Sequence, residues 1–349
     1  MLRIFVLITL LASPLSLFAA PVEKIYFGSC AKQHKPLPIF DAINQDKPDV
    51  FVFLGDNVYS SYFDISQMPK QYQQLGGHKG FKKLRAQSEV IAIWDDHDYG
   101  QGDGGKYFKD KEKSRKYMLD FWREPKDSPR YHQDGIYTSY LYGEGEQTIR
   151  VILPDLRWNR DNLYSVDKAT YETERQPKFM GPYIPSTNPS DQLLGDTQWQ
   201  WLEAELKKPA TIKIIGSGIQ LLNEFSGWET WANFPHERKR LLEFIAKEKI
   251  SGVLFISGDT HFGDISKVSK DLPYALWEIT SSGLSEKWKE VSPNKHRIGK
   301  GVNVVNYGFI EVDWQQADPV IDMGLKGKDG NVIKHFSLRL SQLSADQKT

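Results

Sequence analysis

GVLFISGDTH, residues 252–261, combines the pattern of a buried strand with polar side chains at its end. Its apolar run, from Val253 to Ile256, is soon followed by two polar side chains, Asp259 and His261. A strand buried on both faces needs Val, Ile, Leu and Phe, whereas a carboxylate and an imidazole at its end belong in a crevice. The stretch therefore predicts a buried strand of an α/β protein, with a functional site at its carboxyl end.

Three other stretches have the same design, namely KIYFGSC (24–30), VFVFLGDNVY (50–59) and VIAIWDDHD (90–98). The four strand ends carry side chains of metal-ligand type, which are Cys30, Asp56, Tyr59, Asp96, Asp259 and His261. Ligands in open α/β sheets bind just outside the carboxyl ends of the strands. We therefore expect one binuclear or polynuclear metal site, assembled from distant parts of the sequence, and such a site points to hydrolysis.

The composition bounds the class of protein. The chain has 349 residues, of which 40% are hydrophobic, enough to build a sizeable core. Its 45 basic and 45 acidic residues balance to a formal net charge of zero, and no long block of one sign stands out. The balance gives no electrostatic case for binding nucleic acid or an anionic membrane surface.

The N-terminus predicts export. Arg3 precedes an apolar run over 4–11, and Ala19-Ala20 offers small residues for cleavage, so residues 1–20 are expected to be a signal peptide. No later segment is long and apolar enough to suggest a membrane span. We therefore expect a periplasmic or secreted protein. Cys30, the single cysteine, cannot form an internal disulfide, and its place at a strand end favours metal ligation over burial as a small hydrophobe.

The rest of the chain shows no repeat and no linker, so residues 21–349 are expected to form a single domain. The polar segment 60–80, with Gly76-Gly77, predicts a loop. Residues 159–195 are polar and contain several prolines, which is long for a structureless loop and suggests a lid or a substrate-facing insertion. From Tyr274 onward the sequence is rich in strand patterns.

The WDDHD stretch also carries a candidate acid. If Asp96 holds the metal, His97 lies beside the substrate without being a ligand, and Asp98 can accept a hydrogen bond from one ring nitrogen to fix the tautomer. His97 would then protonate the leaving group. Arg157, just after a predicted strand, is a candidate clamp for a phosphate oxygen, with a surface salt bridge as the alternative interpretation.

The ordered blocks resemble those of the calcineurin-like metallophosphoesterases. GDNVY (55–59) is similar to the GDxxY block, WDDHD (94–98) stands in the place of GNHE or GNHD, and GDTHF (258–262) in the place of GHxH. FGSC (27–30) falls where the first block, DxG, belongs. These departures are similar to the PhoD-like alkaline phosphatase and phosphodiesterase branch of that superfamily.

The resemblance implies a sandwich of two mixed β-sheets flanked by helices. It also implies a centre in which a Cys and a Tyr help hold iron, with calcium in the neighbouring position. Carried over to this chain, the ligands of the first metal are Cys30, Asp56, Tyr59 and His261. Asp56 would bridge to a second metal that Asp96 and Asp259 also hold, and His97 would occupy the position of the catalytic histidine.

One block of the superfamily, VxxH, has no clean counterpart. GSGIQ (216–220) follows a strand in the corresponding place but has no histidine, so either Gln220 substitutes or the ligand is missing. An oxygen-rich second position favours calcium over zinc. Iron with calcium is therefore the expected pair, with zinc and manganese as the alternatives.

These inferences predict an exported, metal-dependent phosphoric ester hydrolase of the alkaline phosphatase type. Metal-bound hydroxide is expected to attack phosphorus, with His97 as the general acid. One alternative is a phosphodiesterase or phospholipase D-like enzyme acting on lipid or cell-wall phosphodiesters, because monoester and diester hydrolysis share this centre. A second alternative is a non-catalytic, exported metal-binding protein, which the missing histidine supports.

Overall fold

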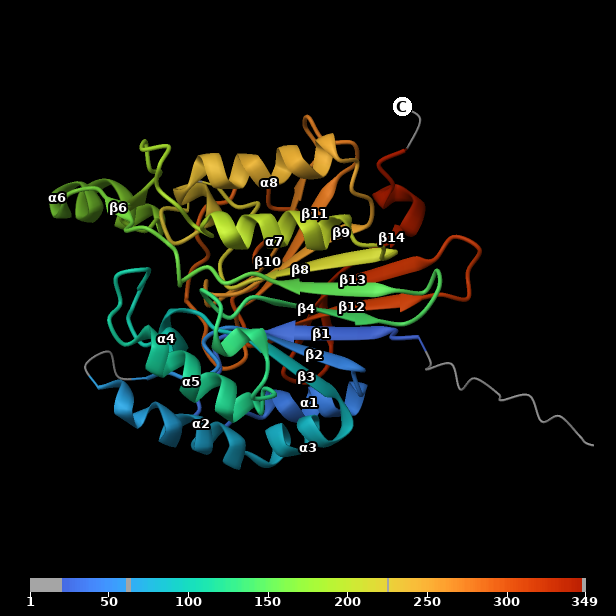
Figure 1. Ribbon diagram of the computed structural model, residues 1–349, viewed down its shortest axis with the longest axis horizontal. Coiled ribbons are helices and arrows are strands. Elements are labelled where there is room, and N and C mark those ends of the chain that lie inside the picture. The colour runs from blue at the N-terminus through green and yellow to red at the C-terminus, as the bar shows by residue number, and fades with distance from the viewer. Residues whose placement is uncertain (1–20, 61–63, 225, 347–349) are drawn as a thin grey trace, which may run out of the picture.

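Two six-stranded sheets form the centre of the computed structural model, which describes residues 21–60, 64–224 and 226–346 (Figure 1). The expected signal peptide, residues 1–20, lies outside the described residues. In the described part of the chain, no helix has the length and apolar character needed to cross a membrane.

The first sheet has the strand order β14-β13-β12-β1-β2-β3. β1, β2 and β3 are parallel, and β12 joins them antiparallel to β1. The bounds of its strands are β1 (Lys24–Gly28), β2 (Val50–Leu54), β3 (Glu89–Ile93), β12 (Asn306–Asp313), β13 (Val320–Gly327) and β14 (Val332–Arg339).

The second sheet has the order β10-β11-β9-β8-β5-β4 and is also mixed. β5, β8, β9 and β11 are parallel, while β4 and β10 are antiparallel edge strands. The bounds are β4 (Thr138–Tyr142), β5 (Ile149–Leu153), β8 (Ile212–Ser217), β9 (Val253–Ser257), β10 (Gly263–Val268) and β11 (Leu276–Ser281).

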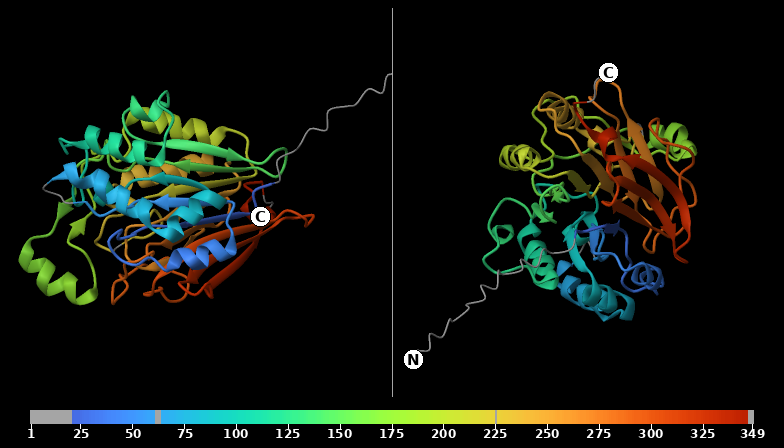
Figure 2. Two further views of the ribbon diagram at one scale, coloured as in Figure 1. Left: turned by 90° about the horizontal axis from the view of Figure 1, so that it is seen from below. Right: turned by 90° about the vertical axis from the view of Figure 1, so that its right-hand side faces the viewer.

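Helices cover the outer face of each sheet (Figures 1 and 2). The helices beside the first sheet are α1 (Ile39–Asp46), α2 (Met68–Gly77), α3 (Lys79–Gln87) and α5 (Lys111–Trp122). Beside the second sheet lie α7 (Asp196–Lys207) and α8 (Pro235–Lys247). The expected two-sheet sandwich flanked by helices is therefore the observed architecture.

β2 shows why this sequence forms this sandwich. All five of its residues are buried, because side chains on both of its faces pack against apolar partners. Phe53 packs on Phe81 of α3 and Trp122 of α5, with ring centroids 5.8 and 5.2 Å apart. On the other face, a Cβ at Gly216 of β8 would lie 3.0 Å from Leu54 Cδ2, so the two sheets meet closely there.

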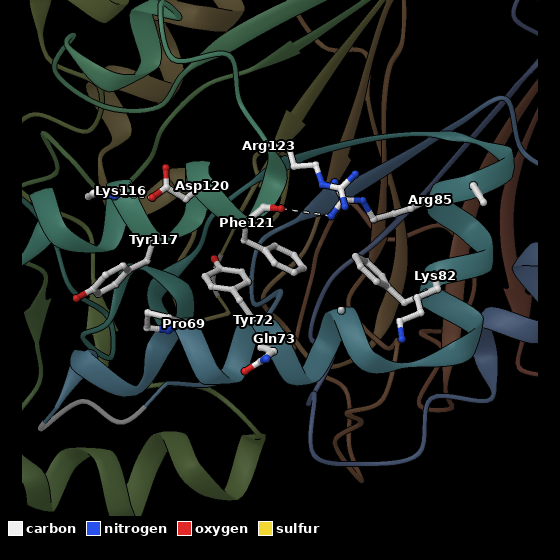
Figure 3. Close-up of a pocket in the computed structure, with 13 residues that line it drawn as sticks. Pro69, Tyr72, Gln73, Lys82, Arg85, Lys116, Tyr117, Asp120, Phe121 and Arg123 are labelled. Atoms are coloured by element: carbon white, nitrogen blue, oxygen red, sulfur yellow. Dashed lines mark hydrogen bonds and ion pairs between the residues drawn. The ribbon is translucent and has the colours of Figure 1, made fainter.

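The prediction of a loop over 60–80 is wrong, because the segment is helical from Ile65 to Gly77, as the short turn Ile65–Gln67 followed by α2. Met68, Tyr72 and Leu75 form its buried face at helical spacing. Figure 3 shows this region, where Tyr72 stacks on Phe121 of α5 at a centroid distance of 4.7 Å. Arg85 of α3 donates to the carbonyl of Phe121 and so satisfies one of the last carbonyls of α5.

The segment 159–195 contains short elements and is not a plain loop. Its antiparallel pair β6 (Tyr164–Ser165) and β7 (Tyr183–Ile184) encloses the short helix α6 (Lys168–Thr170). These elements project from one end of the molecule (Figure 1). The remaining short elements are α4 (Asp96–Tyr99) and the helical turns Ile65–Gln67, Pro129–Tyr131, Tyr171–Arg175, Gln176–Lys178, Trp231–Asn233 and Leu340–Leu343.

The turn after β2 gives a first prediction. Gly55 has φ of 98°, and an added Cβ would lie 2.3 Å from Cβ of Asp95. Gly55→Ala should therefore lower the free energy of unfolding by about 2–5 kcal/mol through backbone strain and overlap. Gly77→Ala is the control, because nothing lies within 4 Å of an added Cβ there. Denaturant melts in which both variants match the parent would contradict the close approach of the two turns.

Candidate metal centre

The candidate ligands meet at the carboxyl ends of β1, β2, β3 and β9, as the sequence pattern predicts. Four of them leave their strands in the left-handed region, with φ of 63° at Cys30, 50° at Asp56, 67° at Asp259 and 55° at His261. Non-glycine residues adopt this conformation at a cost, and such residues cluster at active sites. Four of them at neighbouring strand ends therefore support a functional role for these turns.

One group of ligands surrounds the thiol of Cys30. Donor atoms of Cys30, Asp56 and His261 all lie within 4.8 Å of one another. Cys30 Sγ is 3.5 Å from Asp56 Oδ2, and the Tyr59 hydroxyl is 3.0 Å from His261 Nε2. The four residues expected around the first metal are therefore neighbours.

A second group lies beside the first and shares Asp56 with it. Asp56, Asp96 and His97 offer ligand atoms within 4.8 Å of one another, and so do Asp95, Asp96 and Asp259. Asp56 and Asp96 therefore connect the whole cluster, because each belongs to two of the three groups. A carboxylate at such a shared position can bridge two cations.

Asp95 is a candidate ligand that the sequence analysis missed. It is 1% exposed, and its Oδ2 has no hydrogen-bond partner among the described residues. Buried polar atoms are nearly always satisfied, so an orphaned carboxylate oxygen among other carboxylates suits a cation. The two adjacent aspartates in WDDHD were the available signal, because either of them can be a ligand at that strand end.

The electrostatics of the cluster also suit a cation. Burial raises the pKa of Cys30, Asp56 and Asp259 well above their ordinary values, and neighbouring carboxylates add to each shift. Burial lowers the pKa of His261 to about 4, which keeps its imidazole neutral. A bound cation would lower the pKa of the carboxylates and of the thiol, because metal ligands bind in their deprotonated forms.

Ser282 is another residue that the sequence analysis missed. Its hydroxyl lies 3.0 Å from Cys30 Sγ and accepts a hydrogen bond of 2.7 Å from the backbone N–H of His261. It thus ties the turn after β1 to the turn after β9. The serine-rich end of β11 was a weak signal, because serines at strand ends are common in ordinary turns.

His97 lines the cavity, and its ring also lies within ligand distance of Asp56 and Asp96, whereas Asp98 does not line the cavity. The backbone N–H of His97 donates to Asp56 Oδ1 over 3.3 Å, and its ring lies 4.0 Å from the Tyr59 ring. Asp98 is fully buried and accepts hydrogen bonds from the N–H groups of Asn57 and Asp95. The expectation that Asp98 orients the His97 imidazole is therefore wrong, because Asp98 closes the turn between β3 and α4.

Arg157 does not act as an exposed phosphate clamp. It is 1% exposed, and its guanidinium donates to Asp95 Oδ1 over 2.7 Å and to both oxygens of Glu229 over 2.8 and 2.7 Å. Both carboxylates are also buried, so the hydrogen-bond donors of the Arg157 guanidinium are engaged inside the protein beside the cluster. Its planar fork positions Asp95 and does not reach into the cavity. The surface salt bridge considered as an alternative is wrong for the same reason.

Gln220 does not replace the missing histidine. Its amide nitrogen donates to Thr280 over 2.9 Å, and its oxygen accepts from Asn223 over 2.7 Å. Both bonds lie in the interior of the protein, so the Gln220 amide is already engaged at both of its polar atoms. Among the described residues, carboxylates and the adjacent His97 are the candidate ligands of the second position.

The cluster opens into a cavity of about 650 Å³. Its charged lining is acidic, with Asp56, Asp96, Asp103, Glu229 and Asp259. One side of the cavity is aromatic, with Tyr183, Trp228 and Trp288. Among the lining residues there is no Lys or Arg within the described chain, so an anionic substrate depends on bound cations for neutralisation.

The role of Arg157 gives a second prediction. Arg157→Gln leaves the buried Asp95 without its ion-pair partner and leaves Glu229 with Arg160 alone, so it should cost about 3–5 kcal/mol of stability together with bound metal. Arg240→Gln is the matched control, since its pair with Glu203 is exposed and should cost about 1 kcal/mol or less. Denaturant unfolding and elemental analysis measure both effects. Equal stability of the two variants, with a loss of phosphate affinity only at Arg157, would restore the clamp interpretation.

The chain is similar to a curated protein of known name. The curated alkaline phosphatase D of Bacillus subtilis (strain 168) is 21% identical over 311 residues, which cover 76% of this chain and 49% of the relative. The chain thus spans about half the length of that relative.

Two solved structures share the fold. The structure of PhoD has a TM-score of 0.61 at 16% identity and covers 92% of this chain and 72% of its own. GAP50, the anchor in the inner membrane complex of Plasmodium, has a TM-score of 0.55 at 12% identity, with 91% and 89% covered. The family model for PhoD-like phosphatase matches residues 25–310. Because that match spans most of its length, the chain belongs to the PhoD-like phosphatases, a family of phosphoesterases.

Proposed function

We propose that this protein is a metal-dependent phosphoric ester hydrolase of the alkaline phosphatase type. The observation that carries the proposal is the cluster of three overlapping ligand groups at one cavity. The name of the curated relative, alkaline phosphatase D, supports the same reaction. A buried set of carboxylates, a thiol, a phenol and an imidazole has little structural use without cations.

We assign the first metal to Cys30, Asp56, Tyr59 and His261. Asp56 would contribute to a second metal position as well, which Asp96, Asp259 and Asp95 would also hold. Thiolate, phenolate and imidazole suit iron, while the carboxylate-rich second position suits calcium, with zinc and manganese as alternatives. When bound, such cations activate water and neutralise charge on the phosphoryl oxygens.

His97 is the proposed proton donor. Hydrolysis forms a bond between a water oxygen and phosphorus and breaks the bond to the ester oxygen, which must gain a proton as it leaves. Burial lowers the pKa of His97, which makes its protonated imidazole a stronger acid. The bond from its backbone N–H to Asp56 and the adjacent Tyr59 ring fix its position at the cavity.

Phosphodiesters are the second candidate substrate. The absence of Lys and Arg from the described cavity lining favours an ester with a single negative charge over a doubly charged monoester. Lipid and cell-wall phosphodiesters belong to this class. A panel that compares aryl monoesters with aryl diesters at equal metal loading separates the two candidates.

We also propose that residues 21–349 act as one domain and that residues 1–20 direct export. The buried core of the described residues runs through both sheets without a break, which supports a single unit. The charged start, apolar run and small residues of the N-terminus support a periplasmic or secreted location. N-terminal sequencing of the exported protein identifies the cleavage site.

The proposed roles of His97 and Asp56 predict that their substitutions differ in metal content and in turnover. His97→Ala should retain metal and lose about 10²–10⁴-fold in turnover of esters with poor leaving groups. Asp56→Asn should lose both metal and activity, because it removes the shared ligand. His335→Ala, at an exposed position on β14, is the control and should resemble the parent. Elemental analysis and phosphate release measure the outcomes, and full activity of His97→Ala would remove it as the acid.

The proposed phenolate ligand predicts a colour. With ferric iron bound, the protein should show a visible charge-transfer band that Tyr59→Phe abolishes. Tyr26→Phe is the matched control, since Tyr26 is buried in the first sheet away from the cluster. Removal of metal by a chelator should abolish the band and the activity together. A band that survives in Tyr59→Phe would assign it to another ligand, such as the Cys30 thiolate.

A further inference from the structure

A smaller pocket adjoins the catalytic cavity. Its volume is about 300 Å³, and it shares Tyr183 and Trp228 with the cavity, so these two side chains separate the two spaces. Arg175, Met180 and Pro185 also line it. A ligand part bound in this pocket would therefore lie next to whatever occupies the catalytic cavity.

The two spaces differ in charge. The catalytic cavity is acidic, whereas the smaller pocket is lined by Arg175, Arg238 and Glu224. Glu224 is paired with Arg238 over 3.0 Å and is also contacted by Lys295. Arg175 donates only to backbone carbonyls, those of Gly181 and Tyr183, among the interactions of the described residues. One guanidinium without a carboxylate partner is therefore available to an anion.

Aromatic rings connect the metal cluster with this pocket. The Trp288 ring lies 5.6 Å from the His261 ring, and the Trp228 ring lies 4.8 Å from Trp288. The indole N–H of Trp228 donates to the carbonyl of Phe179 over 3.4 Å. A flat, apolar group that extends from the cavity into the pocket would thus contact aromatic rings, and Arg175 lines the same pocket.

The projecting segment around β6 and β7 holds this wall in place. The N–H of Gly181 donates to the carbonyl of Ser226 over 3.0 Å, and that of Tyr183 donates to the carbonyl of Gly227 over 2.8 Å. A Cβ at Gly181 would lie only 2.2 Å from the Gly227 oxygen, so the two chains approach as closely as backbone allows. Tyr183 and Arg175 are therefore fixed against the body of the protein.

We propose that this pocket is a leaving-group subsite and that the enzyme hydrolyses phosphate esters of aromatic alcohols that carry a second anionic group. The inference rests on the proposed function. The aromatic body lies along Trp228 and Tyr183, and the carboxylate or similar anion pairs with Arg175. Water supplies the new oxygen on phosphorus, the bond to the aromatic oxygen breaks, and that oxygen receives its proton from His97.

The test compares kcat/KM for 3-carboxyphenyl phosphate with that for phenyl phosphate on the metal-loaded protein. The parent should prefer the carboxylated ester, and Arg175→Gln should reduce this preference roughly tenfold, the effect of one charge-assisted bond. Lys178→Gln is the matched control, because it removes the same charge from an exposed position of the same segment. A parent without preference, or equal effects of the two variants, would overturn the proposal.

A second pair of variants keeps Arg175 and its backbone bonds intact. Met180→Glu introduces a carboxylate into the pocket, and Met180→Gln introduces a neutral side chain of the same shape. The preference for the carboxylated ester should fall at least tenfold further in Met180→Glu than in Met180→Gln. Equal preferences in the two variants would show that no anion binds there.

Binding of the product separates this proposal from the proposed function. 3-Hydroxybenzoate needs no turnover, and calorimetry measures its affinity for the parent and for Arg175→Gln. If neither ester is hydrolysed, the proposed function fails, yet a roughly tenfold loss of affinity in Arg175→Gln still supports the anion subsite. Equal affinity in the two proteins overturns the subsite whether or not the esters are hydrolysed.

Discussion

Several carboxylates are buried together at the strand ends, and the surrounding structure has to offset the free-energy cost of their repulsion. Asp56, Asp95, Asp96 and Asp259 lie at neighbouring strand ends, and burial makes their mutual repulsion expensive. Arg157 offsets part of this cost from below through Asp95 and Glu229. Bound cations can offset the electrostatic cost that remains. The fold that gathers these carboxylates and the metal chemistry of the site therefore depend on each other.

The strand ends and the fold could be predicted from the sequence, because both depend on local patterns. A buried strand reads as an apolar run, and the polar residues that end it share one edge of the sheet by topology. Cys30, Asp56 and His261 follow from this argument, and the ordered blocks identify the two-sheet sandwich. α2 could also have been predicted, since Met68, Tyr72 and Leu75 have helical spacing. The polar composition of the segment obscured this spacing.

The partners of Arg157 and Asp98 could not be predicted, because they depend on long-range packing. Arg157 and Asp95 are 62 positions apart in the sequence. No local pattern shows that the Arg157 guanidinium will be buried against the turn that carries Asp95. Asp98 was assigned to His97 by adjacency alone. Successive residues on a helix point in different directions, so neighbours in sequence rarely act on each other's side chains. Their burial and bonding, which only the folded chain provides, decide their roles.

The docking of the projecting segment through backbone groups determines which of its side chains can change. Its bonds to Ser226 and Gly227 use main-chain atoms, whereas the close approach at Gly181 and the hydrogen bond from the Tyr183 hydroxyl to Asp103 restrict side chains. A side chain such as Met180, which takes no part in these contacts, can therefore change while the segment stays docked. The proposed substrate preference and the proposed metal binding thus depend on different parts of the chain, so a change in the docked segment can alter the first without altering the second.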